Sequence, residues 1–276
     1  MVQSPRVARI NVAPVKSLRL RHPDAIRLGR YGATEDRRFL LIDDLGRLYN
    51  GTRDTRLVLV EATWDSTARR LVVTLPDGEI VEGDVVRGPS TRVVIYGRRV
   101  RGHVIEGPWA DALSDVVGRQ LTLVERDDVG WATDLRPATL VSEASLGVID
   151  GDGRRFRMLL EVDGLEAFEE EQWRNRRVRV GEALLLITHP MPRCAVPSTN
   201  PDIGRRDRNV LRELVERRDT VDGEACLGVC AEVLRPGEVR VGDDVEPVVH
   251  RSAAALVDRV RLSGRRLRRV ALNGVS

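Results

Sequence analysis

The first 100 residues consist of short apolar runs separated by closely spaced turn residues, and this pattern constrains the fold more than any other feature of the chain. The apolar runs occur at 38–43, 57–62, 71–75, 79–82 and 92–96. The turn Pro76-Asp77-Gly78 separates two of them, because proline presets one backbone angle and glycine permits the reversal. Short strands at this spacing are typical of an antiparallel barrel or sandwich.

A second series of strand patterns follows the mostly polar stretch 125–137, which we interpret as the join between two domains. The later strands are expected at 138–141, 158–162, 178–180, 184–188, 228–233 and 239–245. Helices are predicted at 108–121, from Ser142 onward and at 209–217, where apolar residues recur at helical spacing or a serine can cap a helix start. We therefore predict a mainly β fold with a few helices (α+β), with domains at 1–130 and 131–248 and an Arg-rich tail at 249–276.

The cysteine content indicates a reducing environment. The chain has three cysteines, Cys194, Cys226 and Cys230, and an odd, small number is a poor disulfide framework. Three thiolates also cannot supply the four ligands of a common iron–sulfur cluster, so no fused cluster is expected. Because no signal peptide and no apolar run of about 20 residues is visible, we expect a cytoplasmic protein with no membrane contact.

The overall charge gives little indication of a nucleic-acid partner. Lys and Arg total 45 against 42 Asp and Glu, a net charge of +3, which makes nucleic-acid binding unlikely. The tail from Arg251 holds seven arginines and one aspartate, so binding of nucleic acid or an acidic partner there stays an alternative that salt-dependent binding would test.

Cys194 is the sharpest candidate for chemistry. It ends the segment His189-Pro190-Met191-Pro192-Arg193-Cys194, which follows an apolar strand that the two prolines are expected to stop. Arg193 beside the sulfur would favour the thiolate, the form that ligates metals or attacks substrates. The alternatives are a small buried hydrophobic residue, or a Cys–His hydrolase with His189 as base, for which no orienting carboxylate is evident. Cys226 and Cys230 are expected to be structural.

Basic side chains gather in four short segments. Lys16, the chain's one lysine, and Ser17 follow an apolar strand and can offer an ammonium and a hydroxyl to a phosphate. In Asp36-Arg37-Arg38, one arginine could reach an anion while the other faces water. Further arginines lie at 154–157 and 204–208. Together they are compatible with one phosphate-bearing ligand held between the domains.

The order of these segments carries a family resemblance. It comprises Pro14-Val15-Lys16-Ser17, Asp36-Arg37-Arg38-Phe39, Leu140-Val141-Ser142-Glu143-Ala144-Ser145-Leu146, Arg155-Phe156-Arg157, Pro192-Arg193-Cys194, Pro201-Asp202-Ile203-Gly204, Pro236-Gly237 and Val241-Gly242-Asp243. From about residue 10 to about residue 247, the chain resembles the MOSC family, in which an N-terminal MOSC β-barrel domain packs on a β-barrel MOSC domain.

The resemblance implies a molybdenum–molybdopterin cofactor, with Cys194 as the protein's metal ligand and catalytic residue. It implies cofactor contacts from Lys16, Ser17 and Arg37 in the first domain, and from Ser142, Arg157 and Arg193 in the second. The implied activity is reduction of small N-hydroxylated or N-oxide substrates with electrons from an external donor of flavin reductase, ferredoxin or cytochrome type. A sulfur or cofactor carrier that uses a Cys194 persulfide is the alternative, ranked second because no pyridoxal-phosphate desulfurase domain is visible.

Overall fold

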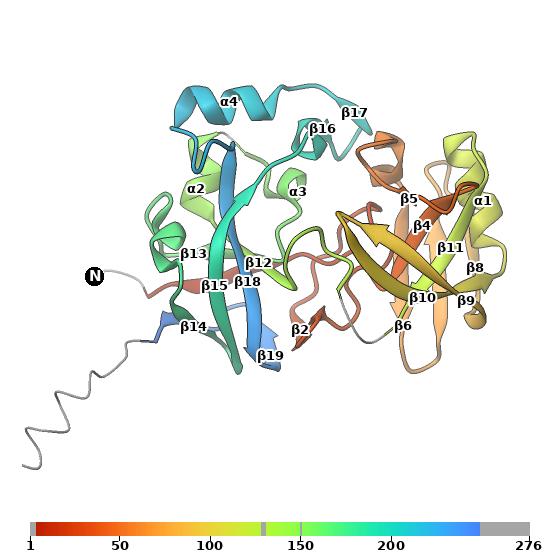
Figure 1. The fold of residues 1–276 in the computed structure, drawn as a ribbon, viewed down its shortest axis with the longest axis horizontal. Coiled ribbons are helices and arrows are strands. Elements are labelled where there is room, and N and C mark those ends of the chain that lie inside the picture. Colours follow the sequence, from red (N-terminus) through yellow and green to blue (C-terminus); the bar gives the residue numbers. More distant parts are fainter. Residues whose placement is uncertain (1–3, 128–130, 150, 249–276) are drawn as a thin grey trace, which may run out of the picture.

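Two β-rich bodies lie side by side along the long axis of the molecule in the computed structural model (Figure 1), which describes residues 4–127, 131–149 and 151–248. The predicted mainly β class with a few helices is confirmed. The Arg-rich tail at 249–276 lies outside the described residues. Within the described ranges, no helix is long and apolar enough to cross a bilayer.

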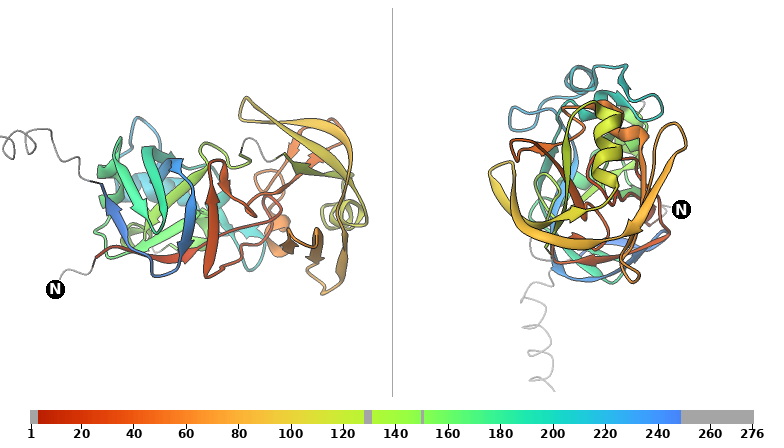
Figure 2. Two further views of the ribbon diagram at one scale, coloured as in Figure 1. Left: turned by 90° about the horizontal axis from the view of Figure 1, so that it is seen from below. Right: turned by 90° about the vertical axis from the view of Figure 1, so that its right-hand side faces the viewer.

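A seven-stranded sheet forms the barrel body. In spatial order its strands are β1 (Arg6–Ile10), β13 (Leu160–Asp163), β12 (Ala138–Ser142), β18 (Cys226–Arg235), β15 (Ala183–Pro192), β14 (Arg177–Val180) and β20 (Val245–Pro247). The first and last strands of this order approach each other, because Arg6 bridges to Asp244 and the Val7 amide donates to the Asp243 carbonyl at 2.9 Å. The sheet therefore curls into a nearly closed barrel, seen from two sides in Figure 2.

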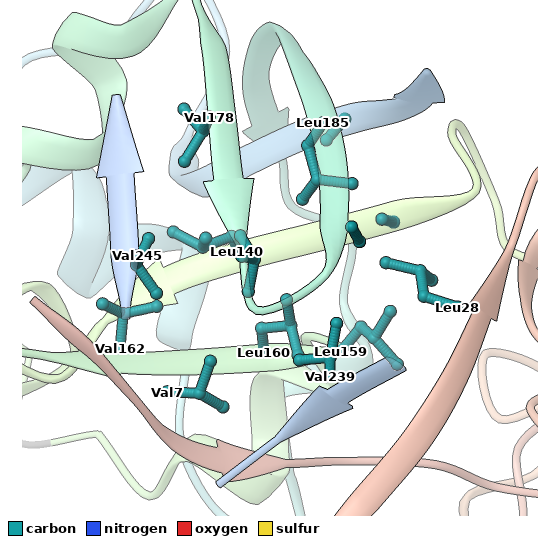
Figure 3. Close-up of a cluster of buried hydrophobic side chains, with 14 of the residues drawn as sticks. Val7, Leu28, Leu140, Leu159, Leu160, Val162, Val178, Leu185, Val239 and Val245 are labelled. Carbon is teal, nitrogen blue, oxygen red and sulfur yellow. The ribbon is translucent and has the colours of Figure 1, made fainter. Parts of the chain in front are cut away.

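The barrel interior is filled by aliphatic side chains from its own strands (Figure 3). Along β14, Val178 and Val180 are buried, whereas Arg177 and Arg179, which alternate with them, are exposed. One face of the strand therefore supplies core and the other meets water. Each fully buried valine or leucine stabilises the fold by roughly 1.5–3 kcal/mol. The alternating pattern therefore decides which face of each strand turns inward.

Strands from the start of the chain contribute to this barrel body. Besides β1, strand β2 (Ala25–Gly29) pairs antiparallel with β19 (Gly237–Arg240) and with β3 (Gly32–Ala33). The predicted domain boundary at residue 130 stays a prediction. β1 and β2 precede this boundary in the chain but pair with strands that follow it.

The second body is built from residues between about 39 and 126. A five-stranded sheet has the order β5 (Leu48–Tyr49), β4 (Phe39–Asp43), β11 (Leu121–Arg126), β10 (Arg98–Glu106) and β9 (Val86–Ile95). A three-stranded sheet comprises β6 (Glu61–Asp65), β7 (Arg70–Thr74) and β8 (Ile80–Asp84). The predicted helix α1 (Trp109–Val117) is confirmed and ends at Gly118, which takes the left-handed conformation (φ 65°) that glycine adopts without strain.

The remaining helical segments are short. They are α2 (Glu143–Val148), α3 (Gly153–Phe156), α4 (Val210–Arg217) and the 3-10 turns Thr55–Leu59, Glu169–Trp173 and Val196–Ser198. The expected helices from Ser142 and at 209–217 are confirmed as α2 and α4. Strands β16 (Thr199–Asn200) and β17 (Arg205–Arg206) form a small ribbon between the 3-10 turn at 196–198 and α4.

Three local predictions are wrong. The run 239–245 is not one strand, because the turn Val241-Gly242 separates β19, which ends at Arg240, from β20, which begins at Val245. The run 57–62 is not one strand, because Asp54 accepts a hydrogen bond from the Arg56 amide and starts a 3-10 turn over Thr55–Leu59; β6 begins only at Glu61. The prolines after residue 188 do not stop β15, which continues to Pro192. Register shifts on both sides of Pro190 accommodate these residues, since a bulge can place a proline where no amide donor is needed.

Candidate functional site

A cavity of about 270 Å³ opens between the two bodies. Six of the seven side chains predicted for the site line it: Lys16, Ser17, Arg37, Arg157, Arg193 and Cys194. These residues come from segments far apart in the chain, from Lys16 near its start to Cys194. The fold therefore brings together side chains that the sequence only placed in order.

Lys16 reaches the cavity because its backbone is fixed against β4. Its amide donates to the Phe39 carbonyl at 2.9 Å, and its buried Nζ donates to the Ala132 carbonyl at 2.9 Å and to Asp134 Oδ1 at 2.6 Å. Burial lowers the pKa of Lys16, and the Asp134 carboxylate opposes that shift. The lysine is thus a buried cation with one anionic partner.

The loop that carries Asp134 is held by Arg98 of β10. The Arg98 guanidinium donates to the carbonyls of Trp131 (3.0 Å), Thr133 (2.6 Å) and Asp134 (2.9 Å), and lies 4.7 Å from the Trp131 ring centre. Burial alone would raise the pKa of Asp134, but the charge and hydrogen bond of Lys16, together with the charges of Arg37 and Arg193, outweigh burial and lower the pKa. The sequence does not mark Asp134 as a site residue, because its polar segment, 125–137, predicts only a join between two domains.

Arg37 and Arg38 are neighbours in the chain but have different partners. Arg37 lines the cavity, forms an ion pair with Asp36 and donates to the Arg157 carbonyl at 3.3 Å. Arg38 does not face water as predicted: it is buried and donates to Glu125 at 2.6 and 3.0 Å. Burial without a partner would be costly for a guanidinium, so the carboxylate of Glu125 explains why Arg38 turns inward.

Arg157 and Arg193 are cations at the cavity wall without carboxylate partners. Arg157 donates to the Leu18 carbonyl at 2.6 Å, and burial together with the charge of Arg37 lowers the pKa of Arg157 to about 9. Arg193 donates to the Phe156 carbonyl at 2.6 Å, and burial lowers its pKa too. Across the described ranges, neither guanidinium forms an ion pair, and the buried Nε of Arg193 has no hydrogen-bond partner.

The backbone at the cavity is strained. Four lining residues other than glycine have positive φ angles: Ser17 (78°), Arg37 (50°), Tyr96 (45°) and Arg157 (54°). Such conformations cost on the order of 1–3 kcal/mol each and concentrate at functional sites. The strain places three of the predicted residues, which supports a role for this cavity in binding.

Cys194 lies two residues beyond the end of β15, exposed at the cavity. Cys226 and Cys230 are buried, and burial raises the pKa of Cys226 to about 11 and that of Cys230 to about 12, so both are poor nucleophiles. His189 is not among the lining residues; its Nδ1 lies 2.9 Å from the Pro190 carbonyl. The Cys–His hydrolase alternative therefore has no geometric support.

No three His, Cys, Asp or Glu side chains of the described segments gather closely enough to hold a metal ion by themselves.

Ser142 does not line the cavity. It is fully buried at the N-terminus of α2, where its Oγ accepts hydrogen bonds from the amides of Ala144 (3.1 Å) and Ser145 (3.4 Å). The hydroxyl is thus engaged as a helix cap, which leaves the expected cofactor contact without geometric support.

Several lining residues were not predicted. They include Asn50, Gly51, Thr52, Tyr96, Asp134 and Arg136. The turn at 50–52 meets the predicted segment directly, since the Gly51 amide donates to Ser17 Oγ at 2.9 Å. Its sequence signals only a turn, so nothing local could have assigned it to the site.

Comparisons with known proteins agree with this architecture. The MOSC domain pattern matches residues 112–246, and the pattern of the MOSC N-terminal beta barrel domain matches residues 4–120. The chain is 25% identical to the mitochondrial amidoxime-reducing component 1 of Mus musculus, over 87% of this chain and 81% of that protein. It is 22% identical to the molybdenum cofactor sulfurase of Homo sapiens, over 88% of this chain but 32% of the sulfurase. Among solved structures, the YuaD protein of Bacillus subtilis is 12% identical with a TM-score of 0.42, over 89% of this chain and 96% of that one.

Proposed function

Because this chain belongs to the MOSC family, we propose that it is a molybdenum-cofactor-binding oxidoreductase that reduces N-hydroxylated or N-oxide compounds. Electrons come from an external donor of flavin reductase, ferredoxin or cytochrome type. The observation that carries the proposal is the cavity that gathers an exposed Cys194 with the partly buried guanidinium groups of Arg157 and Arg193. A cytoplasmic location is part of the same proposal.

The charges around the cavity fit an anionic, phosphate-bearing cofactor. A buried cation without a counter-charge is costly, and an anionic ligand would supply what Arg157 and Arg193 lack. The unpartnered Nε of Arg193 also offers a free donor. We assign Lys16, Ser17 and Arg37 to the cofactor from the N-terminal segment that leads into β4, and Arg157 and Arg193 from the barrel body.

Cys194 is the proposed sulfur ligand to the metal. A soft thiolate suits a metal already bound by sulfur, and Cys194 is the one exposed cysteine of the three. The thioether side chains of Met158 and Met191 line the same cavity, so the surroundings of the sulfur are partly apolar. Such surroundings limit the access of water to the site.

The proposed reaction breaks one N–O bond. An amidoxime takes up two electrons and two protons, and the products are an amidine and water. When bound, the cofactor supplies the two-electron chemistry. The protein's part is to bind and orient the substrate and to hold protons nearby, and the Lys16 Nζ, kept close to the Asp134 carboxylate, is a proton-bearing group at the cavity wall. The amidoxime substrate class is supported by the name of the mouse relative.

The test is molybdenum and pterin content after expression in a host that makes the cofactor. We expect near-stoichiometric metal in the wild type and loss of metal, or a changed metal spectrum, in Cys194→Ser. The matched control is Cys226→Ala, which removes a buried thiol away from the cavity and should keep the metal. Addition of an amidoxime to the reduced wild type should yield the amidine. Absence of metal and pterin from all three proteins would contradict the proposal.

A sulfur carrier is the second candidate, and the exposure of Cys194 favours it. Here the Cys194 thiolate attacks the outer sulfur of a persulfide donor, which forms a Cys194 persulfide and releases the donor thiolate. The similarity to the human cofactor sulfurase supports this candidate. Mass spectrometry after incubation with a persulfide donor should then find one added sulfur, absent from Cys194→Ser, in a protein that never retains metal.

A further inference from the structure

The β9–β10 hairpin ends at the mouth of the cavity. Strand β9 is the edge strand of the five-stranded sheet, and Tyr96 at the hairpin turn lines the cavity. In Figure 1 the β9–β10 hairpin runs across the second body, and its tip reaches toward the barrel body. The hairpin thus connects a broad outer surface with the proposed redox site.

The outer face of this hairpin combines cations with exposed apolar groups. Arg92 of β9 stands directly opposite Arg101 of β10, and Val94 stands opposite Arg99. Val94 is 55% exposed and Tyr96 is 60% exposed. Like charges placed directly opposite each other repel, so the pair of Arg92 and Arg101 does not stabilise the isolated hairpin.

Few acidic groups neutralise this surface. In the part of the chain that the structure describes, Arg92 and Arg99 form no ion pair, and Arg101 lies 4.0 Å from Asp127. On many edge strands, charged side chains have the single role of preventing the strand from pairing with another chain. That role would not need Val94 and Tyr96 in the same exposed surface, whereas a docking site uses apolar contact within a charged rim.

We infer that this outer face, made of Arg92, Val94, Tyr96, Arg99 and Arg101, is the docking surface for an acidic electron-transfer protein. The inference rests on the proposed function. The charge of the face selects an acidic partner, and its continuity with the cavity mouth through Tyr96 places that partner beside the site. Two one-electron deliveries, each oxidising one donor molecule, supply the two electrons for each N–O bond that is broken.

The inner side of the same hairpin links this surface to the cavity wall. Arg98, next to Arg99, holds the carbonyls of Trp131, Thr133 and Asp134. A partner seated on the hairpin would therefore contact the element that fixes the Lys16–Asp134 pair, and donor binding and the site share one rigid support.

The experiment compares two electron sources on the cofactor-loaded full chain with an amidoxime as substrate. Reduced methyl viologen, a small dye, needs no docking surface. Reduced plant-type ferredoxin is the acidic protein probe. The variant is Arg92→Glu/Arg99→Glu, and the control is Arg27→Glu/Arg177→Glu, which reverses two exposed strand arginines on the barrel body. Ferredoxin binding is also measured by calorimetric titration at low and high salt.

We expect the hairpin variant to keep the viologen-driven rate of the wild type. Its ferredoxin-driven kcat/KM at low salt should fall by a factor of about ten or more, since electrostatic steering changes association rates by factors of ten or more. The control should match the wild type. Wild-type ferredoxin binding should weaken as salt rises, and the variant should lose that dependence. Equal ferredoxin binding and equal ferredoxin-driven rates in the wild type and the hairpin variant would overturn the inference. A wild type that fails to turn over with viologen would count against the proposed function, while the titration would still decide the docking surface.

Discussion

Glu125 links three arginine side chains inside the second body, and its replacement by glutamine is a sharp test of how this body is packed. The fully buried carboxylate accepts hydrogen bonds from Arg38 (2.6 Å), Arg69 (2.7 Å) and Arg87 (2.9 Å). Glu125→Gln keeps the shape of the side chain but removes its charge. Three guanidinium groups then face a neutral amide.

The size of the effect follows from the exposure of the three arginines. Their side chains are 10% exposed for Arg38, 39% for Arg69 and 34% for Arg87. Loss of one partner from a buried ion pair costs about 3–5 kcal/mol. Arg69 and Arg87 can turn toward water, where an ion pair contributes at most about 1 kcal/mol, so most of the loss falls on Arg38. We expect Glu125→Gln to lower the free energy of unfolding by about 3 kcal/mol.

Urea unfolding measures this loss. With a slope near 2 kcal/mol per molar urea, the midpoint should fall by about 1–2 M. The control is Glu61→Gln, which removes a carboxylate paired with Arg19 at the surface and should cost less than about 1 kcal/mol. If Glu125→Gln unfolds within about 0.5 kcal/mol of the wild type, the argument from buried charge is refuted.

Acid titration gives an independent readout of the same carboxylate. Burial alone would raise the pKa of Glu125, but hydrogen bonds from Arg87, Arg69 and Arg38 outweigh it and lower the pKa to about 2. A group whose pKa is lowered by folding stabilises the protein above its unfolded pKa, near 4.3, and this contribution is lost as the pH falls toward 2. Between these values the wild type should lose more stability than Glu125→Gln, and parallel curves would contradict the assignment.

Three further substitutions test separate features. Gly228 has φ +73°, and the Cβ of Gly228→Ala would lie 2.7 Å from a backbone carbonyl oxygen; Gly223 has φ +81°, and its Cβ would meet open space. The positive φ alone should cost each alanine variant about 1–2 kcal/mol of unfolding free energy. Urea midpoints should show a larger loss for Gly228→Ala than for Gly223→Ala, because only Gly228→Ala adds a steric clash. Ser142→Ala should lower the free energy of unfolding by about 1 kcal/mol, because it removes the helix cap, and should leave the molybdenum content unchanged. Loss of metal in this variant would indicate that Ser142 does contact the cofactor. Arg157→Met should lower the metal content, whereas the thermal midpoint of the cofactor-free protein should stay equal or rise, because the variant removes a partly buried charge that has no carboxylate partner. A lower midpoint would contradict that reasoning.

The fold was predictable where side-chain alternation records burial. Val178, Arg179 and Val180 alternate because one face of β14 meets the barrel core, and that alternation is visible in the sequence. The run 57–62 misled the prediction because four consecutive apolar residues fit a buried strand and a 3-10 turn equally well. The decisive interaction was the cap from Asp54, which lies outside the run.

The order of the motifs predicted six of the residues that line the cavity, but it did not predict the contacts between them. Cys194, Lys16 and Arg157 followed from the order of the motifs. The partner of Lys16 did not, because Asp134 lies 118 residues away and only the tertiary fold brings the two together. Ser142 holds the expected position in the chain, but hydrogen bonding to the α2 amides fixes its hydroxyl away from the cavity.

The pairing of the first strand with the last one also governs when this protein can fold during synthesis. β1 emerges from the ribosome early, yet its neighbours in the sheet are β13 and the residues just before β20. The second body, whose strands follow one another within about residues 39 to 126, has all its partners much sooner. β1 must therefore wait for its partner β13 until about 150 further residues have been made, and β2, which can pair early with β3, must wait about 200 residues for β19. For these intervals the apolar faces of β1 and β2 depend on protection from aggregation by the folded second body or by chaperones.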